Sequence, residues 1–168
     1  SEKSIVAVTS KIVSITEGRI VEIGSTDKDR LIQQEAQYFL PREINKYGIS
    51  FTITNHILAA AAGIDESNGG GYFVLWPKDP QASANRIRHH LMSRWHLNNV
   101  GVIITDSKTT PLRWGVTGMA IAHSGFQALN SYIGKRDLFG RKFAFEKVNV
   151  MDSLAAAGAF VMGEGKGG

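Results

Sequence analysis

The sequence predicts an α+β fold, with mixed sheets packed against helices, and three observations carry that prediction. Apolar runs of strand length recur along the chain, the most continuous being residues 100–105. Segments with helical periodicity lie between some of these runs, and the clearest begins at Asp79 and Pro80. Several strands follow one another without an intervening helix, which favours α+β over a regularly alternating α/β fold.

Strands are expected where short apolar or alternating runs are bounded by turn-forming residues. These runs are residues 5–8, 20–23, 50–54, 72–76, 100–105, 116–122 and 143–150. The run at 100–105 is continuous, as in a strand buried on both faces, and Asp106 and Ser107 follow it. We therefore expect these two polar residues just past the end of a buried strand, where α/β units commonly place ligand contacts.

Helices are expected at residues 10–15, after Asp27, from Pro80 onward and at residues 154–162. Asp79 is a good N-cap for the third of these, and Pro80 suits the first helical position because its missing N–H is not needed there. One apolar face of this helix is predicted to contain Ala84, Ile87, Leu91 and Trp95.

The other helix ends are predicted from capping residues in the same way. Thr26 or Asp27 begins the second helix, whose mostly apolar face runs to Phe39 before Pro41 stops it. Asp152 or Ser153 is expected to cap the last helix, and Gly163 to close it.

Size and composition are those of an ordinary globular domain. The 168 residues fit a single domain, and the hydrophobic fraction is 43% with 20% charged residues. No apolar run approaches the roughly 20 residues that a membrane span requires. Cysteine is absent, which excludes disulfides and thiolate-bound metals and, with no secretory signal at the start, makes the cytoplasm the expected compartment.

The net charge of +4 is too dispersed to predict nucleic-acid binding. The basic residues form only short local groups and are not interleaved with aromatic residues. A small positive excess suits an anionic small substrate equally well. Neither nucleic acid nor a membrane is expected as a partner.

Three acidic residues lie in segments that favour ligand binding over packing. Asp65 belongs to the polar stretch 63–68, between an apolar run and three glycines, while Asp106 precedes Ser107 and Glu164 lies between glycines. With Asn68 they offer an oxygen-rich set that suits Mg²⁺ or Mn²⁺ better than zinc. The alternatives are a plain surface turn at 63–68 and three unrelated surface acids.

The glycine-rich end of the chain is a candidate phosphate contact. Residues 162–168 read Met-Gly-Glu-Gly-Lys-Gly-Gly, so backbone N–H groups could cradle a phosphate with Lys166 as a point charge. The Gly-Lys-Ser/Thr of a P-loop is absent. A flexible tail is the alternative.

Segments along nearly the whole chain, taken in order, resemble the coenzyme F420-0:L-glutamate ligase (F420:γ-glutamyl ligase) family. No single piece is decisive, but their order is specific. The pieces are residues 9–14, 17–19, 62–68, 79–80, 100–107, 113–116, 120–122, 134–141, 152–157 and 161–165.

The resemblance implies a GTP- and metal-dependent ligase that joins L-glutamate through a γ-linkage to a deazaflavin cofactor precursor. It implies an acyl-phosphate intermediate, a divalent cation (Mg²⁺ or Mn²⁺), with K⁺ as a further candidate ion, and an intertwined homodimer. The metal ligands that it implies are Asp65 and Asp106, with Ser107 and Glu164 at a second metal position. The nucleotide contacts that it implies are Ser10, Lys11, Asn68, Met162, Gly163, Gly165, Lys166, Gly167 and Gly168.

The chain also departs from the family pattern. Ile15 stands where the family usually has lysine, and the segment between Arg19 and Gly63 is shorter than usual. The family's N-terminal portion and final strand are expected to be missing from this single domain, residues 1–168, and the glycine usual after Asp106 is absent. Two alternatives therefore stay open: a γ-glutamate ligase with a folate-like or other acceptor, and a non-catalytic nucleotide- or cofactor-binding homologue.

Overall fold

The central sheet is built around one long strand. The computed structural model describes residues 1–110, 112–163 and 165. In the central sheet, which has three strands, β1 (Ser4–Thr9) runs parallel to β7 (Val100–Thr109), and β7 pairs antiparallel with β8 (Val116–Ser124). The continuous apolar run of β7 is fully buried, as its sequence predicts.

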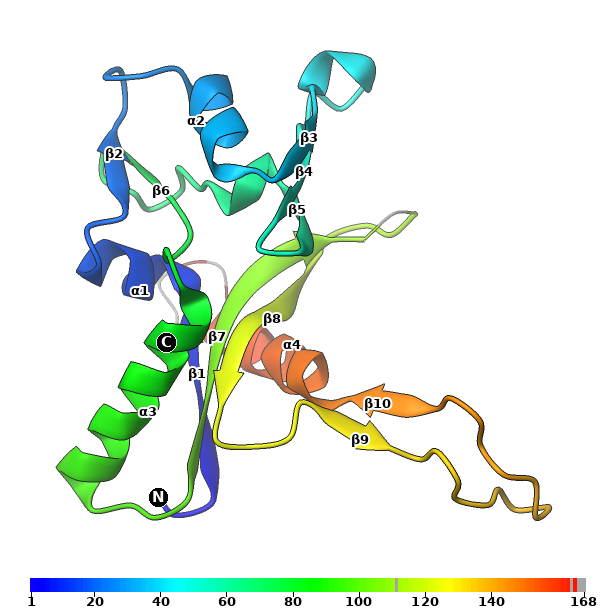
Figure 1. Ribbon diagram of the computed structural model, residues 1–168. Helices are drawn as coiled ribbons and strands as arrows, with labels where there is room; N and C mark the ends of the chain where they lie inside the picture. The colour runs from blue at the N-terminus through cyan, green and yellow to red at the C-terminus, as the bar shows by residue number, and fades with distance from the viewer. Residues whose placement is uncertain (111, 164, 166–168) are drawn as a thin grey trace.

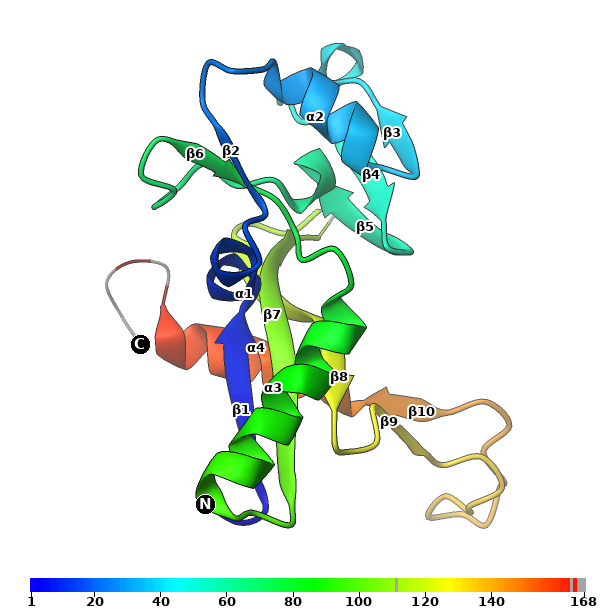
Figure 2. The ribbon, with the colours of Figure 1, turned by 60° about the vertical axis from the view of Figure 1, so that its left-hand side comes forward.

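Helices cover the two faces of this sheet. Figure 2 shows α3 (Pro80–Trp95) in front of it and α4 (Val150–Met162) behind. Val102 and Ile104 pack in one cluster with Ala84 of α3, whereas Ile103 packs in another with Ala155 of α4. Successive residues of a strand point to opposite faces, so this one apolar run supplies the core on both sides. None of the helices in the described part of the chain is long and apolar enough to cross a membrane.

A second group of elements lies beyond the upper end of this sheet in Figure 1. It contains α2 (Lys28–Glu35), the antiparallel pair β2 (Ile20–Glu22) and β6 (Tyr72–Val74), and the meander of β3 (Tyr38–Leu40), β4 (Phe51–Thr54) and β5 (Ile57–Ala60). Two short 3-10 turns, Arg42–Ile44 and Ala61–Gly63, complete it, and α1 (Ser10–Thr16) leads into it from β1. Its core consists of Leu31, Ile32, Ala62, Ile64, Phe73 and Leu75.

The two groups meet around a buried tryptophan. Trp76, which follows β6, is 4% exposed and packs with Ala59 of β5 and Met119 of β8. Because these residues come from both groups, their cluster fixes the upper elements against the central sheet.

A narrow arm projects from the body of the molecule in Figure 1. It consists of β9 (Leu129–Ser131), the antiparallel β10 (Lys147–Asn149) and the intervening residues 132–146. Its side chains include Leu138, Phe139 and Phe145, which are 98%, 95% and 84% exposed.

The predicted mixture of sheets and helices is confirmed, but several element bounds differ. The helix capped by Asp27 ends at Glu35, and Phe39 lies in β3, where the backbone pairs with β4. The strand expected at 143–150 is confined to β10. Asn149, and not Asp152 or Ser153, caps α4, because its side chain accepts the Asp152 N–H at 3.0 Å.

Two further differences concern α3 and β7. Trp95, predicted on the apolar face of α3, is the last residue of that helix and is 56% exposed. β7 continues to Thr109 because residues 116–119 of β8 extend the pairing, so Asp106 and Ser107 lie inside the strand and not beyond it. The register shifts between Ile104 and Thr105, an irregularity of the β-bulge type just before Asp106.

Gly118 of β8 allows α4 to approach the sheet closely. A Cβ at this position would lie 2.4 Å from the Ala159 Cβ and 2.6 Å from the Ala155 carbonyl oxygen. We therefore expect Gly118→Ala to destabilise the protein by about 1–3 kcal/mol through overpacking, measured by denaturant unfolding. Gly165→Ala is the matched control because a Cβ there meets nothing within 4 Å. Equal stability of the two variants would contradict this account of the packing.

Candidate functional site

A pocket of about 340 Å³ lies where the two groups of elements meet. Its walls come from α1, the turn that contains residues 63–68, the segment around Val74–Trp76, the middle of β7 and the end of α4. The lining residues are Thr9, Ser10, Lys11, Ile12, Ile15, Gly63, Asp65, Asn68, Val74, Leu75, Trp76, Thr105, Asp106, Ser107, Ala159, Met162, Gly163 and Gly165.

Asp65 is held in the pocket by backbone pairing and by its own turn. Its N–H donates to the Val74 carbonyl at 3.0 Å, and its carbonyl accepts the Val74 N–H at 2.8 Å. Its carboxylate accepts the Ser67 N–H at 2.7 Å and the Ser67 hydroxyl at 2.9 Å, as in an Asx-turn. The turn predicted at residues 63–68 is therefore present, and it presents a carboxylate to the pocket.

Lys11 connects α1 to this turn. Its ammonium lies 2.7 Å from Asp65 Oδ2 and donates to the Ser67 carbonyl at 2.7 Å and the Ser67 hydroxyl at 3.1 Å. Partial burial by itself would raise the pKa of Asp65, but the hydrogen bonds from Lys11 and Ser67 outweigh it and lower that pKa below its ordinary value.

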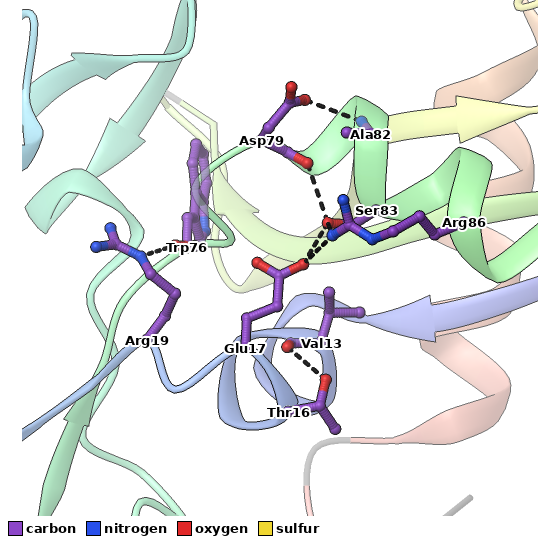
Figure 3. A network of polar contacts seen from close by, with 9 residues as sticks. All are labelled: Val13, Thr16, Glu17, Arg19, Trp76, Asp79, Ala82, Ser83 and Arg86. Carbon is purple, nitrogen blue, oxygen red and sulfur yellow. Dashed lines mark hydrogen bonds and ion pairs between the residues drawn. The ribbon is translucent and has the colours of Figure 1, made fainter.

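A polar network outside the pocket fixes α1, which carries Lys11. Figure 3 shows Glu17, at the end of α1, facing Ser83 and Arg86 of α3. Its carboxylate accepts hydrogen bonds from the Ser83 hydroxyl and, at 2.7 Å, from the Arg86 guanidinium. Ser83 is 1% exposed, and its hydroxyl oxygen also lies 3.0 Å from the Asp79 carbonyl oxygen, so α1 is anchored to a buried site on α3.

Asp106 enters the pocket from the opposite wall. Its Oδ2 accepts a hydrogen bond from the Trp76 indole N–H, and its Oδ1 accepts the Ser107 N–H at 2.9 Å. Burial raises the pKa of Asp106 above its ordinary value, with a contribution from the Asp65 charge, although the hydrogen bonds from Trp76 and Ser107 and the charge of Lys11 act in the opposite direction. The two carboxylates are therefore close enough to influence each other.

Gly63 is required by the packing of Trp76. A Cβ at Gly63 would lie 2.2 Å from two atoms of the indole ring, and its φ of +73° is a conformation that other residues rarely adopt. The glycine at the start of the turn thus has a structural reason, which is the close passage of Trp76.

Nine of the predicted site residues line this one pocket, although they come from four separate parts of the chain. They are Ser10, Lys11, Asp65, Asn68, Asp106, Ser107, Met162, Gly163 and Gly165. The predicted Glu164, Lys166, Gly167 and Gly168 lie outside the described residues. Their roles stay predictions, as do the metal and nucleotide contacts of the other nine.

Sequence reasoning missed Trp76, which supplies the indole contact to Asp106. The sequence predicts Trp76 only as the end of an apolar strand, since a tryptophan before a proline has no catalytic signature. The sequence gives no sign that Trp76 lies near the pocket. Its place there follows from the backbone pairing of Asp65 with Val74, two residues before Trp76.

The donor chemistry of the pocket is compatible with a hard divalent cation. The two carboxylates offer oxygen atoms, and each oxygen has two lone pairs, so the hydrogen bonds described above leave sites for a metal. Among the described residues, no group of three or more His, Asp or Glu side chains is placed to hold a metal ion. A cation here would therefore need further oxygen donors beyond the two aspartates, such as substrate phosphates or water.

The contact between Lys11 and Asp65 gives a direct test of the site's electrostatics. We expect Lys11→Met to raise the pKa of Asp65, because it removes a hydrogen bond and a positive charge that favour the ionised carboxylate. The measurement is a pH titration of the Asp65 carboxyl carbon by NMR. Lys28→Met is the matched control, since Lys28 pairs with the neighbouring Glu66 and not with Asp65. An Asp65 pKa that is the same in both variants would contradict the ion pair.

Comparison with known proteins supplies the family. The family model described as F420-0:γ-glutamyl ligase matches residues 1–168. The coenzyme F420:L-glutamate ligase of Methanopyrus kandleri is 35% identical over 184 residues, covering 97% of this chain and 71% of that protein. The protein of the same name from Methanocaldococcus jannaschii is 33% identical over 180 residues, covering 95% and 70% respectively. A third, from Archaeoglobus fulgidus, is 42% identical over 108 residues, which cover 64% of this chain and 43% of that protein. The chain belongs to the F420-0:γ-glutamyl ligase family.

Proposed function

We propose that this protein is a GTP- and metal-dependent ligase that forms a γ-glutamyl amide bond between L-glutamate and a precursor of coenzyme F420. The observation that carries the proposal is the shared pocket of Asp65, Asp106 and Lys11, which lie on three separate segments of a chain that belongs to this family. The relatives' name, coenzyme F420:L-glutamate ligase, supports glutamate and an F420-type acceptor as substrates.

Asp65 and Asp106 would hold Mg²⁺ or Mn²⁺, and Ser107 with Glu164 would serve a second metal position. K⁺ is a further candidate ion. Bound there, a divalent cation would neutralise phosphate oxygens of the nucleotide, which is the main electrostatic demand of phosphoryl transfer. The oxygen-only donors of these residues support this choice of metal.

The nucleotide would lie along the wall formed by α1 and the end of α4. Lys11 offers a compact positive charge for a phosphate, while Ser10 and Asn68 offer hydrogen-bonding groups in the same pocket. The backbone of Met162, Gly163 and Gly165 borders the same pocket, and the proposed cradle continues through residues 166–168.

The proposed reaction has two steps. A carboxylate oxygen of the acceptor attacks the γ-phosphorus of GTP, so that an acyl phosphate forms and GDP leaves. The glutamate amine then attacks the acyl carbon, the amide bond forms, inorganic phosphate leaves and the amine loses a proton. The task of the protein is to hold the three reactants in line, because positioning and charge stabilisation dominate such transfers.

Ile15 motivates the alternative of a non-catalytic homologue that binds a nucleotide or cofactor. It lines the pocket and is 45% exposed, so an apolar side chain occupies a wall that the family resemblance assigns to lysine. Lys11, four residues earlier on the same helix, supplies a positive charge to the same pocket and supports catalysis. An acceptor other than the deazaflavin is the second alternative.

We further propose a homodimer in which the arm contacts a second copy. Leu138, Phe139 and Phe145 on the arm are almost fully exposed, and Phe160 and Val161 at the end of α4 are 88% and 83% exposed. Monomeric proteins seldom leave large apolar groups together in water, so coverage by a partner would stabilise this surface.

The proposed ligase activity is tested by the incorporation of glutamate into an acceptor. With Mn²⁺, GTP and radiolabelled glutamate, we expect one acceptor from a panel of deazaflavins and pterins to become labelled, with equimolar GDP and phosphate. Asp65→Asn should lower kcat/KM by at least about 100-fold, the upper end for partners of a metal site, and should abolish Mn²⁺ binding. Asp29→Asn is the control, because Asp29 pairs with Arg42 in the second group of elements.

The same experiment separates the alternatives. Labelling of a pterin and not of a deazaflavin would change the acceptor and leave the reaction class intact. GTP binding with no turnover on any acceptor would favour the non-catalytic homologue. Unchanged Mn²⁺ affinity in Asp65→Asn would remove Asp65 as a metal ligand.

The proposed role of the arm in the homodimer is tested separately by the mass of the protein in solution. By sedimentation velocity, the unaltered chain should have twice the monomer mass, whereas the triple variant Leu138→Ser, Phe139→Ser and Phe145→Ser should be monomeric, because it loses the apolar contact area. Trp95→Ser, at an exposed apolar residue on α3, is the control and should stay dimeric. A monomeric unaltered chain would contradict the homodimer.

A further inference from the structure

The indole of Trp76 is directed at one of the two pocket carboxylates from outside its own segment. Its N–H donates to Asp106 Oδ2, a residue 30 positions later in the chain. The other hydrogen bond described for this carboxylate comes from its sequence neighbour Ser107. Within the described residues, the bond from Trp76 therefore links the orientation of the Asp106 carboxylate to a segment distant in the sequence.

Trp76 is itself fixed at three points. Its ring packs beside Gly63, where no Cβ could fit, and it is 4% exposed in the cluster that joins the two groups of elements. Its carbonyl accepts a hydrogen bond from Arg19 Nε at 3.0 Å, as Figure 3 shows. Arg19 in turn forms an ion pair with Glu35 of α2. The indole N–H consequently has little freedom to point elsewhere.

We propose that Trp76 is a positioning residue for Asp106, and that its indole N–H holds the carboxylate in the orientation in which it binds a divalent cation. The inference rests on the proposed metal-binding role of Asp106. A hydrogen bond to one lone pair of a carboxylate leaves the others for a metal and fixes the plane of the group. Donors of this kind orient metal ligands, and their loss typically weakens metal binding by about 10–100-fold.

A replacement that keeps the ring but removes the donor separates positioning from packing. Trp76→Phe retains an aromatic side chain beside Gly63 and removes the N–H. We expect it to weaken Mn²⁺ binding by about 10–100-fold, measured from the EPR signal of free Mn²⁺. Trp95→Phe is the matched control and should bind Mn²⁺ as the unaltered protein does, because Trp95 lies 56% exposed on α3.

A second measurement uses the unaltered protein and does not depend on the variant folding. The chain has three tryptophans, so ¹⁵N labelling gives three indole N–H signals, which Trp→Phe variants assign. On addition of Mg²⁺, the Trp76 signal should shift while those of Trp95 and Trp114 stay in place. Asp106→Asn should also move the Trp76 signal in the absence of metal.

The outcomes distinguish this inference from the proposed function. If the unaltered protein binds no Mn²⁺ or Mg²⁺, the metal-dependent function and the role of Trp76 both fail. If it binds metal but Trp76→Phe binds equally well, or the Trp76 indole signal does not shift on addition of Mg²⁺, only the positioning role fails. A loss of affinity in Trp76→Phe with a Mg²⁺-sensitive Trp76 signal supports it.

Discussion

Burial of one strand, β7, on both faces is the constraint on which the rest of the structure depends. Its first six residues are buried, and Val102, Ile103 and Ile104 are at most 1% exposed. Burying side chains of this size contributes about 1.5–3 kcal/mol each to stability, which can offset the free-energy cost of partly burying a charged side chain on the same strand. That side chain is Asp106, which follows the apolar run and is only partly exposed.

β7 changes from buried residues to partly exposed, polar residues where it borders the pocket. The shift in register between Ile104 and Thr105 comes one residue before the buried part of the strand ends. Irregularities of this type redirect side chains and often lie beside functional sites. Beyond it, pairing with residues 116–119 keeps the strand extended, so Asp106 stands on a rigid element and not on a loop. Rigid support suits a residue that must hold a fixed geometry.

How much of this could be predicted from the sequence depends on the range of the interaction concerned. Local chemistry predicted the helix that begins at Pro80 and the turn at residues 63–68, because a capping aspartate and turn-forming residues act within a few positions. It failed at α4, where Asn149 and Asp152 are both good caps, but the Asp152 carboxylate instead accepts the Ala120 N–H of β8 at 2.9 Å. It also failed at Asp106, because the extension of β7 depends on β8.

In the candidate site, too, local features could be predicted from the sequence and long-range contacts could not. Asp65 and Asp106 could be selected from the sequence as polar groups beside small or apolar segments, whereas Lys11 entered only through the family resemblance, which also put the three together. The contact between Trp76 and Asp106 could not be predicted, because it joins residues 30 positions apart through the pairing of β6 and the passage of the ring over Gly63. Tertiary geometry alone makes a core tryptophan into a partner of a pocket carboxylate.

The two carboxylates of the pocket are not electrostatically equivalent, and this difference bears on where a cation would act. Lys11 contacts Asp65 directly and, with Ser67, lowers the pKa of that carboxylate, whereas burial raises the pKa of Asp106. The ionised form of Asp65 is already stabilised by an ammonium, but that of Asp106 is stabilised chiefly by neutral donors. A cation that approaches Asp65 therefore meets the ammonium of Lys11, which already pairs with that carboxylate. The orientation of Asp106, and with it the indole contact from Trp76, therefore bears on the proposed metal site alongside the carboxylate of Asp65.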